Sequence, residues 1–307
     1  MPDRKPGVAI LLATYNGSRF LQQQLDSIAA QSSVDWVLFW RDDGSSDDTV
    51  AIVTAFLVRA GRGTRVRGPE ERVGPSESFL ALLGHAAAVY PDATVAFADQ
   101  DDVWLEDKLH RGVLGLAGVD GPAIYCARQI LVDEELVVLR PSAPLQTPPG
   151  FAAALTQNVA TGCTVMLNPA AVALVASSRA PSATLHDWWC YLVVMAAGGR
   201  LVLDQEPSML YRQHRANMIG APQSLVRRAT AALLRGPDIF MNVLHGHVAA
   251  LLAQPALLSV EARHVLTVLQ AGLHGGWAER RVALRLPGLR RQTAVETALF
   301  RWWFLIG

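Results

Sequence analysis

The sequence predicts an α/β fold in which a single, mostly parallel sheet is flanked by helices. Three short apolar runs, at residues 8–13, 36–40 and 94–98, each end in a polar, turn-forming loop. Such runs are typical of strands that are buried on both faces of a parallel sheet. Because the carboxyl ends of parallel strands meet at one edge of the sheet, we expect the three polar loops to line one crevice.

The first two strands each lead into a helix. Ser18 is expected to cap the helix after the first strand, and Ser46 the helix after the second. A third helix is expected to begin near Ser76, ahead of the strand at residues 94–98. Strand, loop and helix repeated in this order indicate parallel pairing.

The second half of the chain is less regular. Strands are predicted at residues 124–127, 129–132, 162–167 and 210–213, and helices are predicted to begin at Pro169 and His186. Further helices are predicted at residues 223–234, 238–254 and 259–273. We therefore predict a first domain at residues 1–222 and a helical, basic C-terminal extension at residues 223–307.

Charge is unevenly distributed, although the formal net charge is zero. Ten arginines and only four acidic residues follow residue 225. This excess suggests an anionic partner for the extension, and a lipid surface or a lipid-linked phosphate is favoured over nucleic acid. The three cysteines lack the spacing of a zinc site, the chain does not open with a secretory signal pattern, and the apolar runs are too short to span a bilayer. We expect a cytoplasmic protein.

Three carboxylates, those of Asp99, Asp101 and Asp102, follow the buried strand at residues 94–98. Repulsion between them would be costly unless a cation or hydrogen-bond donors compensated it. Mg²⁺ or Mn²⁺ prefers such oxygen ligands and keeps room for phosphate oxygens. The alternative for any acidic loop is a solvated turn, but the apolar lead-in favours a metal-dependent phosphate site.

Six motifs in this chain occur in the order seen in family 2 glycosyltransferases, and the series resembles the bacterial rhamnosyltransferase branch. They lie at residues 13–17, 42–47, 98–104, 161–164, 186–189 and 211–214, and the resemblance covers about residues 7–220. It implies the A-type glycosyltransferase fold, a single nucleotide-sugar-binding α/β domain. A proline in the loop at residues 72–76 departs from the family pattern and leaves the donor sugar less certain.

The resemblance also implies roles for individual residues. Nucleotide-sugar contacts are expected from Thr14, Tyr15, Asn16, Asp42, Asp43, Gly44, Asp99, Gln100, Asp102, Gly162, Cys163, Trp188, Trp189 and Arg212. Asp101 would bind the metal, with Asp102 as the alternative ligand. Apart from the resemblance, His214 could complete the metal shell, contact the diphosphate or lie at the domain edge. Asp187 would be the base that deprotonates the acceptor, with inversion at the anomeric carbon. By itself, Asp187 could equally be a helix cap, and the two tryptophans could be core residues.

The resemblance favours transfer of L-rhamnose from dTDP-rhamnose to a surface polysaccharide or a lipid-linked acceptor. A UDP-hexose or UDP-N-acetylhexosamine donor is an alternative, as is a non-catalytic nucleotide-sugar-binding module. A nucleotidyltransferase is disfavoured because the loop at residues 14–19 is not glycine-rich. The basic, tryptophan-containing end at residues 277–307 is typical of an interfacial helix at the inner face of the cytoplasmic membrane. It could instead pack on the catalytic domain or on a second subunit.

Overall fold

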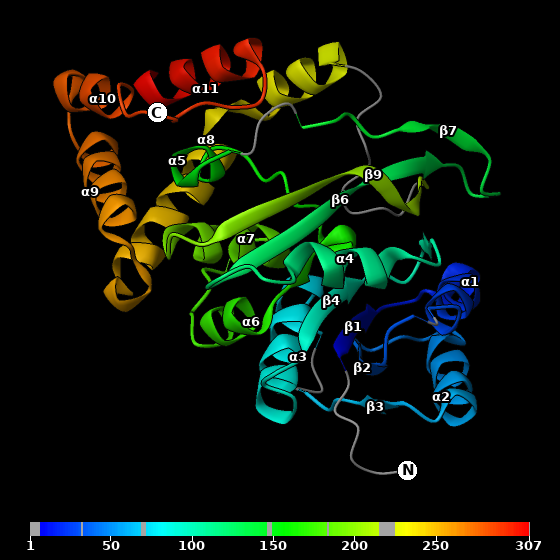
Figure 1. Cartoon of the computed structure of the whole chain (residues 1–307). Helices are drawn as coiled ribbons and strands as arrows, with labels where there is room; N and C mark the ends of the chain where they lie inside the picture. Colours follow the sequence, from blue (N-terminus) through cyan, green and yellow to red (C-terminus); the bar gives the residue numbers. More distant parts are fainter. Residues whose placement is uncertain are drawn as a thin grey trace.

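A computed structural model describes residues 7–31, 33–68, 72–145, 149–182, 184–214 and 225–306, with the backbone alone for residues 225–237. Its centre is one mixed sheet with the strand order β3-β2-β1-β4-β8-β6-β9-β5, and β7 pairs with β6 (Figure 1). The strands are β1 Val8–Thr14, β2 Trp36–Asp42, β3 Gly63–Arg65, β4 Thr94–Ala98, β5 Val103–Trp104, β6 Ala123–Val132, β7 Val138–Pro141, β8 Met166–Leu167 and β9 Arg200–Arg212.

The first half of the sheet is parallel. β1 pairs in parallel with β2, so that Thr14 lies opposite Asp42, and with β4, so that Leu12 lies opposite Ala98. The three strands consequently end together, and the loops after them share one edge. The α/β fold class is confirmed, with the sheet becoming mixed beyond β4, where β8 runs antiparallel to both β4 and β6.

Two strand predictions in the second half were wrong in detail. The strands predicted at residues 124–127 and 129–132 are one strand, β6, whose pairing with β9 shifts register at Arg128. Most of the strand predicted at residues 162–167 is a 3₁₀ turn, Gly162–Thr164, followed by the two-residue β8. The Gly162 N–H donates to the Asp187 carboxylate instead of to a neighbouring strand, which explains the turn.

Helices cover both faces of the sheet (Figure 1). They are α1 Ser18–Ala29, α2 Thr49–Ala60, α3 Pro75–Val89, α4 Lys108–Leu116, α5 Phe151–Ala154, α6 Pro169–Ala176 and α7 His186–Ala196. Side chains of β1 alternate between two cores: Ile10 packs with α1, α2 and α4, whereas Leu11 packs with α3, α6 and α7. This alternation is what a strand buried on both faces requires.

The predicted helix caps differ from those observed. Gly17 precedes α1, and Ser18 is its first helical residue. Asp48 precedes α2, because the N–H and hydroxyl of Ser46 bond to Asn16 Oδ1 and hold Ser46 in the preceding loop.

The C-terminal extension is helical and shares the core of the first domain. Its helices are α8 Leu225–Leu252, α9 Val260–His274, α10 Trp277–Ala283 and α11 Ala294–Ile306. The break expected near Pro237 does not occur, since α8 continues through it. Buried Leu244, Leu266 and Phe300 belong to the same apolar cluster as Trp189 of α7. The predicted boundary at residue 222 lies outside the described residues, among which no helix is both long and apolar enough to cross a membrane.

Candidate active site

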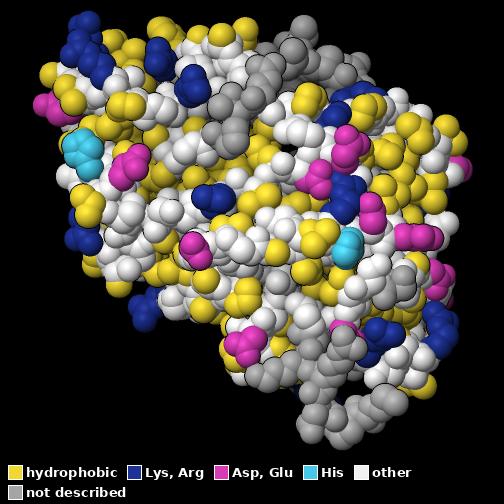
Figure 2. All heavy atoms as spheres, viewed as in Figure 1, with side chains coloured by type: hydrophobic (Ala, Val, Ile, Leu, Met, Phe, Trp, Pro, Cys, Tyr) yellow, Lys and Arg dark blue, Asp and Glu magenta, His cyan; other side chains and the backbone are white. Residues whose placement is uncertain are grey.

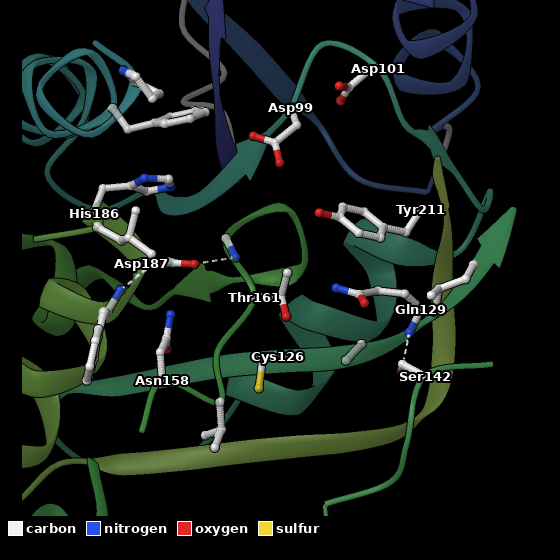
Figure 3. A pocket seen from close by; sticks show the side chains of 18 of the residues that line it. Asp99, Asp101, Cys126, Gln129, Ser142, Asn158, Thr161, His186, Asp187 and Tyr211 are labelled. Carbon is white, nitrogen blue, oxygen red and sulfur yellow. Dashed lines mark hydrogen bonds between the residues drawn. The ribbon is translucent and has the colours of Figure 1, made fainter. Parts of the chain in front are cut away.

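A cavity of about 1470 Å³ opens where β1 and β4 end and continues past α7 to β6, β9 and the segment before α11. Small-molecule pockets usually measure about 300–1000 Å³, so this cavity has room for two substrates. Eleven of the predicted site residues line it: Thr14, Tyr15, Asn16, Asp43, Asp99, Gln100, Asp101, Gly162, Asp187, Trp188 and His214. Figure 3 shows the side chains around its centre.

The loops after β1 and β4 are joined to each other. The Tyr15 N–H donates to Gln100 Oε1 over 2.9 Å, and Gln100 Nε2 donates to the Tyr15 carbonyl over 3.0 Å. A Cβ at Gly17 would lie 2.4 Å from Gln100 Oε1, so glycine is required for this approach. The Arg72 guanidinium stacks 3.7 Å from the centre of the Tyr15 ring. Tyr15 therefore presents a fixed backbone and a ring covered by a cation at the mouth of the cavity.

The loop after β2 is organised by Asp42, which lies behind the cavity wall. Its carboxylate accepts hydrogen bonds from Thr14 Oγ1 and from both the N–H and the hydroxyl of Ser45. Gly44 follows with a φ of 88°, a left-handed conformation that favours glycine. Asp42 and Gly44 shape the loop and are not among the residues that line the cavity, so their donor contacts stay predictions.

Asp43 faces the cavity with a buried carboxylate. The carboxylate pairs with Arg41 over 3.3 Å and accepts the N–H groups of Val73 and Gly74 at 2.9 and 2.8 Å. These contacts tie the loop after β2 to the start of α3.

The acidic loop after β4 contains two carboxyl groups with raised pKa values. Burial, together with the charges of Asp101 and Asp187, raises the pKa of Asp99 to about 7. Burial and the neighbouring Asp101 and Asp99 raise the pKa of Asp102 well above its usual range. Buried Lys108 lies on the other side of this loop and donates to the Cys163 carbonyl over 2.8 Å. The loop therefore concentrates negative charge that a cation in the cavity would stabilise.

Asp101 and His214 meet at the cavity surface. His214 Nε2 lies 2.9 Å from Asp101 Oδ2, which brings together the two residues predicted to bind metal. A carboxylate and an imidazole beside an open cavity suit Mn²⁺ or Mg²⁺. Asp102 is fully buried, which favours Asp101 as the ligand.

A second cluster near this loop does not suit a hard cation. Ligand atoms of Asp99, Asp102 and Cys163 all lie within 4.8 Å of one another. Burial raises the pKa of the Cys163 thiol well above its usual range, so the sulfur stays protonated. Cys163 is thus a buried packing residue, and the expected contact between Cys163 and the donor is corrected.

Asp187 lies in the first turn of α7 and faces the cavity opposite Asp99 (Figure 3). Its Oδ2 accepts the Gly162 N–H over 2.9 Å, and its Oδ1 accepts the Trp188 N–H over 2.6 Å. Burial raises the pKa of Asp187 to about 6, although these two donors and the amide of Asn158 lower it in part. A carboxylate that is oriented, partly desolvated and still ionised at neutral pH is suited to accept a proton.

The residues next to Asp187 have different environments. Trp188 lines the cavity and donates from its indole to the Ala154 carbonyl over 2.8 Å. Trp189 is fully buried, and its indole donates to Ser178, so the expected sugar contact of Trp189 is corrected to core packing. His186 stacks on Phe79 with ring centres 4.2 Å apart, and burial lowers the pKa of His186 to about 3. The imidazole is therefore neutral.

Arg212 supports the acidic loop from behind. It is 1% exposed, its N–H donates to Asp102 Oδ1, and its Nε donates to the Asp101 carbonyl over 2.8 Å. Its guanidinium also bonds to the Glu134 carbonyl and to Gln23 Oε1, and lies over Phe20. The predicted nucleotide-sugar contact of Arg212 is corrected, because its donors are used to hold the loop.

Several residues at the cavity were not predicted. Tyr211 points its hydroxyl into the cavity near Thr161 and Gln129, and Asn158 lies beside Asp187 (Figure 3). Tyr211 belongs to the motif at residues 211–214 but was given no role of its own, and the sequence carried no signal for Gln129 or Asn158. Lys108 did carry one, since a lysine nine residues after Asp99 at the start of a helix is positioned to face the same loop.

Residues 9–171 match the family model described as glycosyl transferase family 2. The chain is 27% identical over 220 residues to the dTDP-rhamnosyl transferase RfbG of Shigella flexneri, covering 68% of this chain and 74% of that protein. It is 28% identical over 102 residues to the UDP-Glc:alpha-D-GlcNAc-diphosphoundecaprenol beta-1,3-glucosyltransferase WfgD of Escherichia coli, covering 33% and 38% of the two chains.

The fold is similar to that of S. aureus TarS residues 1–349, solved in complex with UDP-GlcNAc. The TM-score is 0.59 at 13% identity, over 90% of this chain and 78% of that one. At this identity the likeness concerns the fold alone, which is that of A-type glycosyltransferases. Because the family match spans more than half of its 307 residues, this chain belongs to glycosyl transferase family 2 and is a glycosyl transfer enzyme.

Proposed function

We propose that this protein is an inverting glycosyltransferase of bacterial surface glycan synthesis, which moves a sugar from a nucleotide donor to a hydroxyl group of a glycan or lipid-linked acceptor. The observation that carries the proposal is the position of Asp187. Its carboxylate is oriented by the N–H groups of Gly162 and Trp188 and faces the acidic loop across one cavity. In-line displacement at a sugar carbon needs a base on one side of that carbon and the departing diphosphate on the other. Asp187 and the acidic loop lie on opposite walls of the cavity, as this arrangement requires.

Each substrate has a separate place in this scheme. The nucleotide lies against Thr14, Tyr15 and Asp43, at the ends of the parallel strands, where ligands of such sheets bind. The acceptor hydroxyl oxygen attacks the anomeric carbon as the bond from that carbon to the diphosphate breaks. Asp187 takes the proton of this hydroxyl, so the attacking oxygen gains negative character during the step. Attack opposite the leaving group inverts the anomeric configuration.

Asp101 and His214 would hold a divalent cation next to the diphosphate. When bound, Mg²⁺ or Mn²⁺ supplies positive charge that stabilises the departing diphosphate. Asp99 stands beside Asp101 on the same loop, where burial, together with the charges of Asp101 and Asp187, raises the pKa of Asp99. Arg212 holds this loop in place from behind the cavity, and the charge of buried Lys108 acts on Asp99 and Asp102.

dTDP-L-rhamnose is the donor that we infer, on the strength of the similarity to the rhamnosyl transferase RfbG. A UDP-hexose or UDP-N-acetylhexosamine remains the alternative, supported by the names of WfgD and of the TarS complex. A non-catalytic binding module is disfavoured because Asp101, Asp187 and His214 share the cavity.

Calorimetry with dTDP-rhamnose, UDP-glucose and UDP-N-acetylglucosamine tests the proposal, each with Mn²⁺ and then with excess chelator. We expect metal-dependent binding of dTDP-rhamnose. Preference for a UDP-sugar would change the inferred donor but not the mechanism. Donor binding that is equally strong with and without chelator would contradict the metal-binding role of Asp101 and His214. Failure of all three donors to bind would contradict the transferase mechanism proposed here.

The extension also contacts a membrane surface in this proposal. Trp277, Val282 and Trp302 are more than half exposed, and basic side chains gather beside hydrophobic ones over the α10 end of the molecule (Figure 2). Apolar and basic side chains together are typical of peripheral attachment to anionic lipid. Packing on a second subunit is the competing explanation for the same exposed side chains.

Sedimentation with anionic phosphatidylglycerol vesicles distinguishes these explanations. Deleting the extension is unsuitable, because Phe300 and Phe304 are part of the core. The double variant Trp277→Ala, Trp302→Ala should lose most of the vesicle-bound fraction, whereas Val58→Ala, at an 80% exposed site on α2, should not. Equal binding by the two variants, or a concentration-dependent dimer lost in the double variant, would contradict membrane attachment.

A further inference from the structure

The cavity continues beyond Asp187 into a second half that the predicted motifs do not reach. Five carboxamide side chains line this half: Gln129 of β6, Gln157 and Asn158 after α5, Gln205 of β9, and Gln292 before α11. We call these five residues the amide wall. They come from segments that are far apart in the sequence, and Gln292 belongs to the C-terminal extension. Figure 3 shows Gln129 and Asn158 on the side of the cavity away from Asp101.

The amide wall is held together by contacts that leave amide groups available. The Gln292 N–H donates to Gln157 Oε1 over 3.0 Å, which fixes the extension against the segment after α5 and leaves Gln157 Nε2 as a donor. Asn158 accepts the Ala160 N–H over 3.1 Å, and its amide also lies beside Asp187. Within the described part of the chain, the Gln292 side chain makes no hydrogen bond. Half-buried amides of this kind gain from a ligand that both donates and accepts.

The charged groups in this half are already engaged. Arg128 donates to the carbonyls of Ser142 and Gln205, and the Asp204 carboxylate accepts from Arg111 and Tyr125. Thr293 and Glu296 bond to each other and cap α11, so helix capping alone explains them. Arg140 of β7 also lines the cavity and has a partner of its own, so the groups left to recognise a ligand are mainly neutral amides, which match hydroxyl groups better than phosphate.

We propose that the amide wall binds the acceptor as a saccharide ring, so that the C-terminal extension supplies part of the acceptor site through Gln292. This inference rests on the proposed function and adds the substrate class of its second site. An acceptor sugar seated there would present a hydroxyl to Asp187, which is linked to the wall through Asn158. A lipid-linked acceptor would also be held by its sugar at this position.

The test uses the full-length protein with the donor that calorimetry selects. The acceptor probes are the 4-nitrophenyl glycosides of L-rhamnose, D-glucose and N-acetyl-D-glucosamine. Gln292→Ala and Gln157→Ala should each raise the acceptor KM about five- to tenfold, as expected for one lost hydrogen bond. Donor affinity should stay unchanged, as should the slow release of nucleoside diphosphate without acceptor. Gln22→Ala, at an exposed position on α1, is the matched control.

The outcomes separate this inference from the function on which it rests. If the wild-type protein binds no donor, the proposed function fails. If donor binds but none of the three glycosides is glycosylated, or if both glutamine variants keep the wild-type acceptor KM, the amide wall is not the acceptor site. Weaker donor binding in Gln292→Ala would also overturn the assignment, because it would place the donor at this wall.

Discussion

The two halves of the cavity are built in different ways. On the nucleotide side, short loops after β1, β2 and β4 are fixed by one another, as in the paired hydrogen bonds between Tyr15 and Gln100. On the acceptor side, the wall is assembled from β6, β9, the segment after α5 and the extension, and Gln157 and Gln292 are 135 positions apart. The nucleotide side is therefore built from loops at the ends of neighbouring parallel strands, whereas the acceptor side depends on how segments outside these strands pack.

This difference suggests how the two halves can vary. Parallel pairing brings the ends of β1, β2 and β4 together in any such sheet, so the nucleotide side follows from the fold class. No backbone rule fixes the neighbours of Gln292, which reaches the cavity because α11 packs on the catalytic core. Changes of acceptor can thus arise in the extension without disturbing the donor loops.

The largest expected effect lies where the two halves meet, at Asp187. Asp187→Asn keeps the shape of the side chain but removes the base, so transfer should fall by about 100- to 10,000-fold. Donor affinity should be unchanged by calorimetry, because the nucleotide contacts lie elsewhere. Asp120→Asn, at an exposed position, is the control. A transfer rate near that of the wild type in Asp187→Asn would contradict the role of Asp187 as the base and would indicate that it only caps α7.

Removing the buried ammonium group of Lys108, behind the acidic loop, should strongly destabilise the nucleotide half. Lys108→Met removes a buried positive charge that acts on Asp99 and Asp102, and it breaks the bond to Cys163. We expect a loss of about 3 kcal/mol in the free energy of unfolding, measured by urea denaturation. Arg59→Met, which removes an exposed pair with Asp26, should cost less than about 1 kcal/mol. Equal losses would mean that Lys108 does not support this loop.

A smaller effect is expected from crowding the joined loops of the nucleotide half. In Gly17→Ala the new Cβ would lie 2.4 Å from Gln100 Oε1, so Gln100 must move and its bonds to Tyr15 are lost. The donor Kd should rise about tenfold, corresponding to roughly one net hydrogen bond, while the acceptor KM stays unchanged. Gly84→Ala, where a Cβ has open space, should bind donor normally. An altered acceptor KM would show that the two halves are coupled.

The smallest effect is a shift in pH dependence at the junction. Because burial raises the pKa of Asp187 to about 6, the transfer rate should fall about tenfold per pH unit below that value as the base becomes protonated. Asn158 lowers the pKa of Asp187, so Asn158→Ala should move this acid limb to higher pH. Steady-state rates measured from pH 5 to 8 test this shift. If the acid limb of Asn158→Ala lies at the same pH as that of the wild type, Asn158 does not act on Asp187.

The same pKa makes a prediction about stability. The folded-state pKa of Asp187 lies above the usual value for aspartate, so folding favours its protonated form. The stability from this group is present below about pH 4 and is lost as the pH rises through about 6. The difference in unfolding free energy between Asp187→Asn and the wild type should change across this window. A constant difference would contradict the raised pKa.

The site was predicted best where residue type and strand position agreed. Asp99 and Asp101 were found because they follow a buried strand, Asp187 was found through the family resemblance, and all three line one cavity. Arg212 and Trp189 were misjudged because an arginine or a tryptophan in a motif can equally serve the core, and only burial distinguishes the two roles. The roles of Asp101, Asp187 and His214 stay predictions until they are measured.

The sequence by itself determined the fold class, the order of the first strands and helices, and the three polar loops at one sheet edge, because these follow from local periodicity and chain direction. Only the tertiary structure decided that Arg212 braces the acidic loop, that β6 is one strand, and that Gln292 reaches the cavity. Such contacts join residues many positions apart, and they depend on packing that no local pattern records.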